Sequence, residues 1–200
     1  MYPGVILAGG SARRLGGNGK AFINIIGIPL INLVLQKFEP QVEKLAINTR
    51  DKKKFTKYNY PIIEDVIREQ GGSGPLAGIS SAIKWAKKLT NPMSHVVTVP
   101  VDTPLLPLDL VHKMSLELET KKSDIIFASS NKNSYPVVSM WSLELDKNLD
   151  NALREGVRKI DSFTSAYNVS IVDWSFNDID PFFNINNPED IVLAEKYIKS

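Results

Sequence analysis

Short apolar runs alternate with segments of helical periodicity along most of the chain. The runs are rich in Val and Ile, and several are continuous, which is typical of strands buried on both faces. We predict strands at residues 5–8, 45–48, 61–63, 96–99, 125–128, 137–141 and 169–172. The patterns between them predict helices at residues 30–38, 76–88, 108–119, 159–166 and 189–199. This order indicates an α/β fold with helices packed around a mainly parallel central sheet.

Two local signals refine this picture. Asn187 is a typical helix N-cap and Pro188 suits the first helical position, while Glu189 and Asp190 place negative charge at the positive end of the helix. The last helix is therefore predicted to begin here. Residues 129–134 are polar and are predicted to form a loop between two strands.

The composition is that of an ordinary globular protein, with 43% hydrophobic and 23% charged residues among 200. The sequence contains no cysteine, which fits a reducing compartment. A net charge of +2 is too small to indicate nucleic-acid binding. There is no signal-peptide pattern, and no apolar run approaches the about 20 residues that cross a bilayer. We expect a cytoplasmic protein that binds neither nucleic acid nor membranes.

A glycine-rich loop follows the first predicted strand, where residues 7–20 read LAGGSARRLGGNGK. Gly9 and Gly10 lack side chains, so backbone N–H groups could approach a phosphate there. Arg13 and Lys20 supply positive charge. The loop matches neither the dinucleotide fingerprint nor the Walker A pattern. A phosphate-binding loop is the favoured interpretation, and a turn with arginines nearby by chance is the alternative.

Asp102 lies just past the predicted strand at residues 96–99, in the sequence PVDTPLLP. Pro100 and Pro104 restrict the backbone on either side of it. A carboxylate at the end of a buried strand suits Mg²⁺, which prefers one or two carboxylates together with phosphate oxygens. The alternative is that Asp102 is a turn residue or a helix cap.

Weaker candidates lie at other strand ends. Asn48 ends the second predicted strand and Asp65 follows the third, so their side chains could bind the edge of a nucleobase. Gly74, Pro75 and Leu76 precede or begin a helix whose backbone amides could line a base or ribose pocket. Each residue could equally serve only as a cap or a turn residue.

His95 and His112 are expected to have structural roles. The sequence offers neither a cysteine nor a second nearby histidine for a metal site. A G-x-S-x-G motif is also absent, so covalent acyl chemistry is not indicated.

The motifs LAGGSARRLGGNGK, IIED, GPLAG, PVDTPLLP and FFNINNPEDI together resemble the molybdenum cofactor guanylyltransferase (MobA) family, within the α/β nucleotidyltransferases. The resemblance extends over nearly the whole chain. It implies a three-layer Rossmann-like nucleotidyltransferase fold with a mixed sheet, in one domain over residues 1–200. Residues 1–110 would be the nucleotide-binding half and residues 111–200 the acceptor-binding half.

The activity that the resemblance implies is transfer of GMP from GTP to the terminal phosphate of molybdopterin or Mo-molybdopterin, with release of pyrophosphate. Mg²⁺ would be the cofactor, and enzymes that accept the finished cofactor would be possible partners. The implied nucleotide-binding residues are Leu7, Ala8, Gly9, Gly10, Lys20, Asn48, Asp65, Gly74, Pro75, Leu76 and Asp102. The implied acceptor-binding residues are Arg158, Lys159, Asn184 and Asn186.

Lys20, Asp102 and Arg13 are the expected catalytic residues. An acceptor phosphate is already anionic and needs no general base, so catalysis would consist of positioning and charge neutralisation. Asp102 would bind Mg²⁺, while Lys20 and Arg13 would stabilise the leaving pyrophosphate.

The chain departs from the family pattern in two places. Gly19 stands where relatives commonly have Asp, and Tyr135 precedes Pro136 where they tend to have His. Both changes could alter affinity or pterin binding.

The choice of nucleotide stays open. Gly10 gives LAGG, whereas related CTP and UTP enzymes tend to have LAAG, but transferases that use other bases also carry LAGG. A molybdopterin cytidylyltransferase, or a transferase with another phosphate acceptor, is the alternative. A non-catalytic nucleotide-binding or partner-binding module is an alternative of another class, and it would be expected to lack Asp102 or Lys20.

Overall fold

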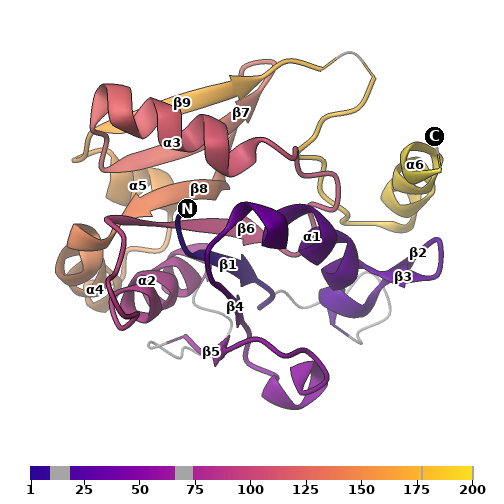
Figure 1. Cartoon of the computed structure of the whole chain (residues 1–200), viewed down its shortest axis with the longest axis horizontal. Coiled ribbons are helices and arrows are strands. Elements are labelled where there is room, and N and C mark those ends of the chain that lie inside the picture. Colours follow the sequence, from indigo (N-terminus) through magenta and orange to yellow (C-terminus); the bar gives the residue numbers. More distant parts are fainter. Residues whose placement is uncertain (10–18, 66–73, 177, 200) are drawn as a thin grey trace.

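The computed structural model describes residues 1–9, 19–65, 74–176 and 178–199. Within these ranges, seven strands form one sheet in the order β5-β4-β1-β6-β8-β7-β9 (Figure 1). These strands are β1 (Gly4–Leu7), β4 (Leu45–Asn48), β5 (Ile62–Ile63), β6 (His95–Pro100), β7 (Ile125–Ser130), β8 (Asn133–Ser142) and β9 (Val169–Trp174). Only β8 runs antiparallel to its described neighbours. The predicted α/β fold with a mixed, mainly parallel sheet is confirmed.

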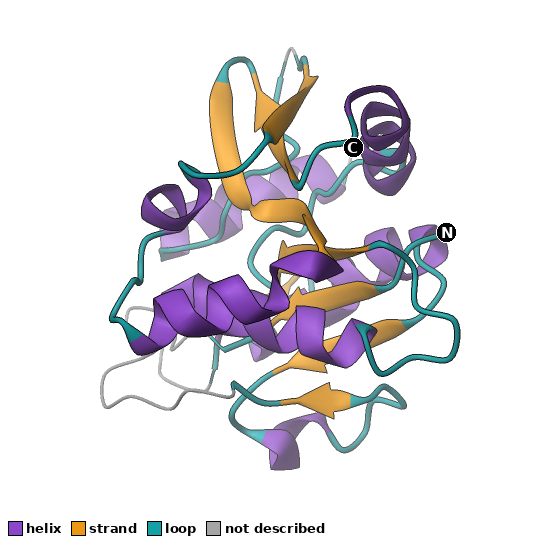
Figure 2. Ribbon diagram, turned by 90° about the vertical axis from the view of Figure 1, so that its left-hand side faces the viewer, coloured by secondary structure: helices purple, strands orange, loops and turns teal. Residues whose placement is uncertain are grey.

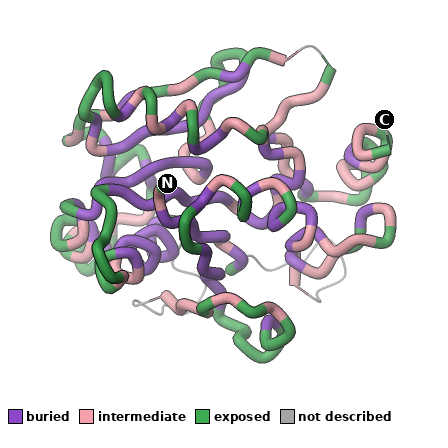
Figure 3. Tube along the Cα trace, in the orientation of Figure 1, coloured by how far each residue is buried: buried purple, intermediate pink, exposed green. Residues whose placement is uncertain are grey.

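Helices cover both faces of this sheet (Figure 2). One face packs against α1 (Leu30–Phe38) and α3 (Leu110–Lys121), and the other packs against α2 (Gly74–Ala86), α4 (Asp146–Arg154) and α5 (Ile160–Thr164). Successive strand residues belong to different cores. The central strands are therefore buried on both sides, as their continuous apolar runs predict (Figure 3).

The helix α6 (Pro188–Ile198) lies apart from the main sheet, beside the small hairpin of β2 (Asn24–Ile25) and β3 (Ile28–Pro29) (Figure 1). A separate apolar cluster joins them, with Ile25, Leu30 and Ala194 fully buried. The predicted helix start is confirmed, because the Asn187 side chain and Asp190 form a reciprocal capping box. This helix is therefore fixed both by its cap and by the hairpin.

Several elements differ from the sequence prediction. The helix α4 was not predicted because only Leu149 and Leu153 of it are buried, which is too sparse for a clear apolar pattern. The loop predicted at residues 129–134 is mostly strand, so that prediction was wrong in extent. The turn itself consists of Asn131 and Lys132, whose φ angles are 44° and 73°. Such a two-residue turn suits the twist of a β-hairpin.

Short 3₁₀ helices complete the described secondary structure: η1 (Lys20–Phe22), η2 (Glu39–Gln41), η3 (Lys52–Phe55) and η4 (Leu143–Leu145). None of the helices in the described ranges is long and apolar enough to span a membrane.

Gly4 shows how tightly α1 packs on the sheet. A Cβ atom at this position would lie 2.7 Å from Phe38 Cε1 and 2.7 Å from Val42 Cγ1. We expect Gly4→Ala to lower the free energy of unfolding by about 1–3 kcal/mol, the usual cost of overpacking a core. Urea denaturation measures this change. Gly9→Ala is the control because, apart from its chain neighbours, no atom of the residues that the structure describes lies within 4 Å of the new Cβ. An equal effect of both changes would contradict the packing.

Candidate active site

The carboxyl ends of three parallel strands meet at one edge of the sheet. Leu7, the last residue of β1, is level with Asn48 of β4 and Pro100 of β6. The backbone continues this pairing past the strands, because Ala8 N donates to Asn48 O (2.8 Å) and Val101 N donates to Leu7 O (3.1 Å). Ligands of open α/β sheets bind at such an edge. The predicted residues at the ends of these strands are thus brought together.

Lys20 and Asp102 contact each other directly at this edge. Lys20 Nζ forms an ion pair with Asp102 Oδ2, and the two side chains are only 13% and 19% exposed. Lys20 Nζ also donates to Asn186 Oδ1 at 2.7 Å. One ammonium group therefore joins the end of β6 to a residue from the far end of the chain.

The segment around Asn184 is attached to the residues beside Asp102. Ile185 N donates to the backbone oxygen of Asp102 at 2.9 Å. The hydroxyl of Thr103, which is fully buried, donates to Asn184 Oδ1 at 2.7 Å. Asn184 and Asn186, both expected at the acceptor site, therefore lie next to the expected metal ligand.

Tyr135 supports this segment from β8. Its hydroxyl donates to Asp180 Oδ2, and the second oxygen of Asp180 accepts from Phe182 N at 2.8 Å. Burial, followed by the hydrogen bond to Asp180, raises the pKa of the Tyr135 phenol. The residue that departs from the family pattern thus helps to fix the chain that leads to Asn184.

The other departure also has a structural account. Gly19 adopts a φ of +94° immediately before η1. This backbone conformation is readily available to glycine and is strained for an L-residue such as Asp. Glycine at this position therefore suits the conformation from which Lys20 extends.

Asn48 and Asp65 form a hydrogen-bonded pair, with Asn48 Nδ2 donating to Asp65 Oδ1 at 3.1 Å. Arg50 Nη2 lies 3.5 Å from Asp65 Oδ2. The sequence prediction did not include Arg50, although it is the last residue of the INTR motif. A Cβ atom on Gly78 would lie 3.0 Å from Asn48 Oδ1 and 3.1 Å from Leu7 Cδ2. The second glycine of GPLAG therefore allows α2 to approach the strand ends closely.

Gly74 begins α2 with a φ of +68°, and a Cβ there would lie 3.5 Å from the backbone oxygen of Arg158. The guanidinium of Arg158 donates to Leu153 O (2.7 Å) and Val157 O (2.8 Å). Lys159 is exposed beside it, at the start of α5. The structure thus places Arg158 and Lys159 near the start of α2, whereas Asn184 and Asn186 lie beside Asp102 and Lys20.

Gly10 and Arg13 lie outside the described residues. At the described ends of that loop, Gly9 and Lys20 line a cavity of about 100 Å³ together with Thr49, Arg50 and Phe55. This volume is below the roughly 300–1,000 Å³ of typical ligand pockets. The cavity marks the edge of a site rather than the whole of it.

Asp102 is a single carboxylate, so by itself it could supply only part of the coordination shell of a metal ion. Across the described ranges, no group of three or more His, Cys, Asp or Glu residues could hold a metal ion. A single carboxylate fits Mg²⁺, which completes its shell with phosphate oxygens and water. The arrangement therefore suits a metal that arrives with a phosphate ligand.

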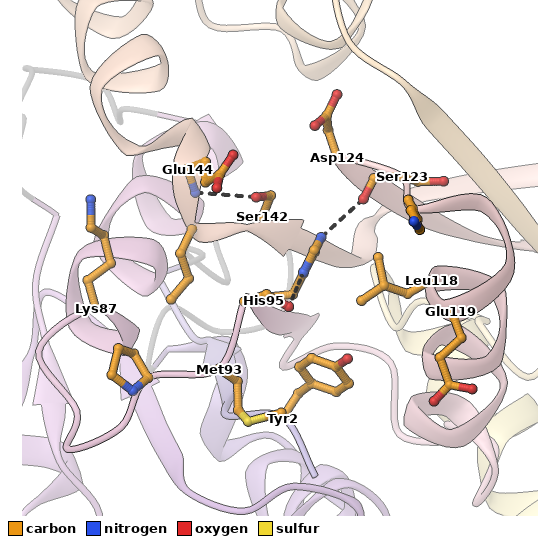
Figure 4. A pocket seen from close by; sticks show the side chains of 14 residues that line it. Tyr2, Lys87, Met93, His95, Leu118, Glu119, Ser123, Asp124, Ser142 and Glu144 are labelled. Carbon is orange, nitrogen blue, oxygen red and sulfur yellow. Dashed lines mark hydrogen bonds between the residues drawn. The ribbon is translucent and has the colours of Figure 1, made fainter.

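A larger cavity of about 610 Å³ lies at the opposite end of the sheet, where β6 begins (Figure 4). His95 lies at its centre, with Nε2 3.1 Å from Ser123 O and Nδ1 2.9 Å from Ser94 Oγ. Because a carbonyl only accepts, we assign the proton to Nε2. Both nitrogens are thus satisfied, as expected of a structural histidine.

Comparisons with known proteins identify the family of this chain. The family model described as MobA-like NTP transferase domain matches residues 4–168. The molybdenum cofactor guanylyltransferase of Rhodopseudomonas palustris (strain BisB5) is 37% identical over 196 residues, which cover 97% of this chain and 92% of that protein. The chain belongs to the MobA-like NTP transferase family.

Other proteins of related sequence or structure support the same family and fold for this MobA-like chain. The molybdenum cofactor guanylyltransferase of Shewanella sediminis is 36% identical over 186 residues, covering 92% of this chain and 91% of the relative. Among solved structures, molybdopterin-guanine dinucleotide biosynthesis protein A from Archaeoglobus fulgidus superposes with a TM-score of 0.80 at 23% identity, covering 99% of both chains. The latter likeness shows the shared fold.

His95 of the MobA-like chain gives a pH prediction, because burial lowers its pKa below the ordinary 6.5. The unfolded chain then binds a proton at higher pH than the folded chain. The stabilising contribution of neutral His95 is therefore complete above pH 6.5 and is lost as pH falls toward the folded pKa. We expect the free energy of unfolding, measured in urea, to fall more steeply between pH 7.5 and 5.5 in the wild type than in His95→Gln.

His112→Gln is the matched control, because His112 is exposed on α3. It should retain the steep pH dependence of the wild type. Parallel pH profiles for the wild type and His95→Gln would contradict the assignment of His95 as a buried neutral group.

Proposed function

We propose that this chain transfers GMP from GTP to the terminal phosphate of molybdopterin or Mo-molybdopterin and releases pyrophosphate. The observation that carries the proposal is the meeting of Lys20 with Asp102 and Asn186 at the carboxyl edge of the sheet. It joins a cation for phosphates, a carboxylate for a metal and a polar residue of the acceptor half. The guanylyltransferases at 36–37% identity support GTP as the donor.

The reaction is an in-line displacement at the α-phosphorus of GTP. An oxygen of the acceptor phosphate forms the new P–O bond, and the bond to the bridging oxygen of the β-phosphate breaks. The attacking phosphate is anionic, so the protein provides no general base. Its contribution is to position two anions and to neutralise their charge.

Lys20 is the proposed partner of the phosphates. Its ammonium lies at the end of β6, directed between Asp102 and Asn186, and can stabilise the negative charge that grows on the departing pyrophosphate. Arg13 is proposed to assist from the loop outside the described residues. Leu7, Ala8, Gly9 and Gly10 would place backbone groups against the nucleotide.

Asp102 is the proposed ligand of Mg²⁺. When bound, the metal neutralises phosphate charge and orients the phosphates. The attachment of Ile185 N to the backbone of Asp102 keeps this carboxylate in place relative to the acceptor half.

The guanosine is proposed to bind near Asn48 and Asp65. The Watson–Crick edge of guanine presents two N–H donors, which a carboxylate such as that of Asp65 can accept. Asn48 Nδ2 fixes one oxygen of this carboxylate. Gly74, Pro75 and Leu76, at the start of α2, would border the base or the ribose.

Arg158, Lys159, Asn184 and Asn186 are the proposed acceptor-binding residues. The division into a nucleotide half at residues 1–110 and an acceptor half at residues 111–200 remains part of this proposal. So do a cytoplasmic location and delivery of the product to enzymes that use it.

The catalytic assignment is tested by Lys20→Ala and Asp102→Ala. Each should lower kcat on the order of 10²-fold, because one preorganised charge is lost. Lys121→Ala and Glu117→Ala each remove one partner of a surface ion pair on α3, in which Lys121 is exposed and Glu117 partly exposed, and serve as controls that keep near-normal turnover. Normal turnover of correctly folded Lys20→Ala and Asp102→Ala would refute the assignment.

The reaction itself is tested by supplying molybdopterin, Mg²⁺ and GTP, CTP, UTP or ATP in separate assays. Mass spectrometry then identifies the dinucleotide formed. We expect the guanine dinucleotide from GTP and little product from the other three. A cytosine product would instead identify a cytidylyltransferase, and nucleotide binding without any transfer would indicate a non-catalytic module.

A further inference from the structure

The helix α6 and the residues before it contact the Lys20 region by two separate routes. They lie beyond residue 168, where the match to the family model ends. Lys20 and Asn186 are 166 residues apart in the sequence, and their contact depends on how the end of the chain folds back. The features that fix this contact therefore bear on the proposed active site.

The first route passes through Asp190. Its Oδ2 atom accepts from the backbone N–H of Asn186 at 2.7 Å and from that of Asn187 at 3.0 Å. The contact with Asn187 belongs to the capping box of α6, whereas the contact with Asn186 extends beyond it. The Asn186 side chain is exposed, whereas the preceding Ile185 is buried and its N–H donates to Asp102 O. The carboxylate thus fixes the backbone of the residue whose side chain accepts from Lys20.

The second route passes through the β2–β3 hairpin, which begins two residues after η1 ends. The N–H of Ile26 donates to Glu195 Oε1 of α6 at 3.3 Å. Ile185 and Ala194 are buried against Ile25 of the hairpin. The helix that fixes Asn186 therefore also fixes the chain that immediately follows Lys20.

The helix α6 thus contacts the chain at both ends of the hydrogen bond between Lys20 and Asn186. A lysine side chain has several rotatable bonds, and one ion pair with Asp102 leaves its ammonium free to swing about the carboxylate. A second acceptor at 2.7 Å defines the direction of the ammonium. The effect of this second acceptor depends on the position of Asn186, which Asp190 helps to set through the Asn186 N–H.

We propose that Asp190 is a positioning residue for Lys20 and acts through Asn186. The helix α6 then helps to orient the lysine of the active site. The kinetic test of this inference rests on the proposed guanylyl transfer, whereas the NMR test of the nucleotide-free protein does not.

The kinetic test compares Asp190→Ala with Asn187→Ala. Both remove a partner from the capping box, but Asn187→Ala leaves the carboxylate bonded to the N–H of Asn186. We expect Asp190→Ala to lower kcat on the order of 10-fold, as loss of an outer-shell partner commonly does, with a smaller change in KM for GTP. Asn187→Ala should keep near-normal kcat. Asp190→Asn, which keeps an oxygen acceptor, should restore most of the lost activity.

A double variant tests the route of action. If Asp190 acts through Asn186, the double variant Asn186→Ala/Asp190→Ala should be no slower than Asn186→Ala alone. Multiplicative losses, or an equal loss of kcat in Asn187→Ala and Asp190→Ala, would overturn the proposal.

NMR of the nucleotide-free protein keeps the inference separate from the proposed function. We expect Asp190→Ala to shift both the backbone amide signal of Asn186 and the side-chain signals of Lys20, while Asn187→Ala leaves the Lys20 signals in place. These shifts would support the positioning role even if no nucleotide were transferred. Unchanged Lys20 signals in Asp190→Ala would refute it even if guanylyl transfer were confirmed.

Discussion

The parallel pairing of β1 between β4 and β6 is the constraint on which the rest of the structure depends. It makes Leu7 level with both Asn48 and Pro100, so the residues that follow all three strands emerge at one edge. A shift of one residue in either pairing would turn every side chain of that strand to the other face. Burial on both faces prevents such a shift, because each face carries its own apolar core. The position of the site thus follows from the packing of the sheet.

Strong apolar periodicity made much of the fold predictable. The predicted ranges for α1 and β4 match the structure at both ends. The start of α6 could be placed because Asn187 and Pro188 are local signals whose physical effect does not depend on the rest of the chain. Some elements with few buried residues were not predicted. The strands of the β2–β3 hairpin have two residues each, and α4 buries only Leu149 and Leu153.

The candidate site was predictable where strand ends determine it and not where side chains meet across long loops. Asp102 and Asn48 follow from the rule that parallel strands end at a common edge. The direct contact of Asn186 with Lys20 does not, because the path of the chain after β9 has no periodic pattern. Arg50 beside Asp65, and Gly78 beneath Asn48, depend on three-dimensional proximity that a single sequence does not report. The order of the motifs indicated the type of chemistry, whereas the distances between the site residues depend on how the chain packs.

The hydrogen bond between Lys20 and Asn186 has a consequence for synthesis on the ribosome. The strands that form the sheet edge are all translated before residue 186, so a nascent chain can already contain β1, β4 and β6 while lacking one partner of its lysine. Contacts between residues so far apart in sequence form late, because a long loop must close first. The contacts of Lys20 are therefore complete only after residue 186 has been translated. A chain interrupted before residue 186 would contain Lys20 and Asp102 but not Asn186, the second acceptor of the lysine ammonium.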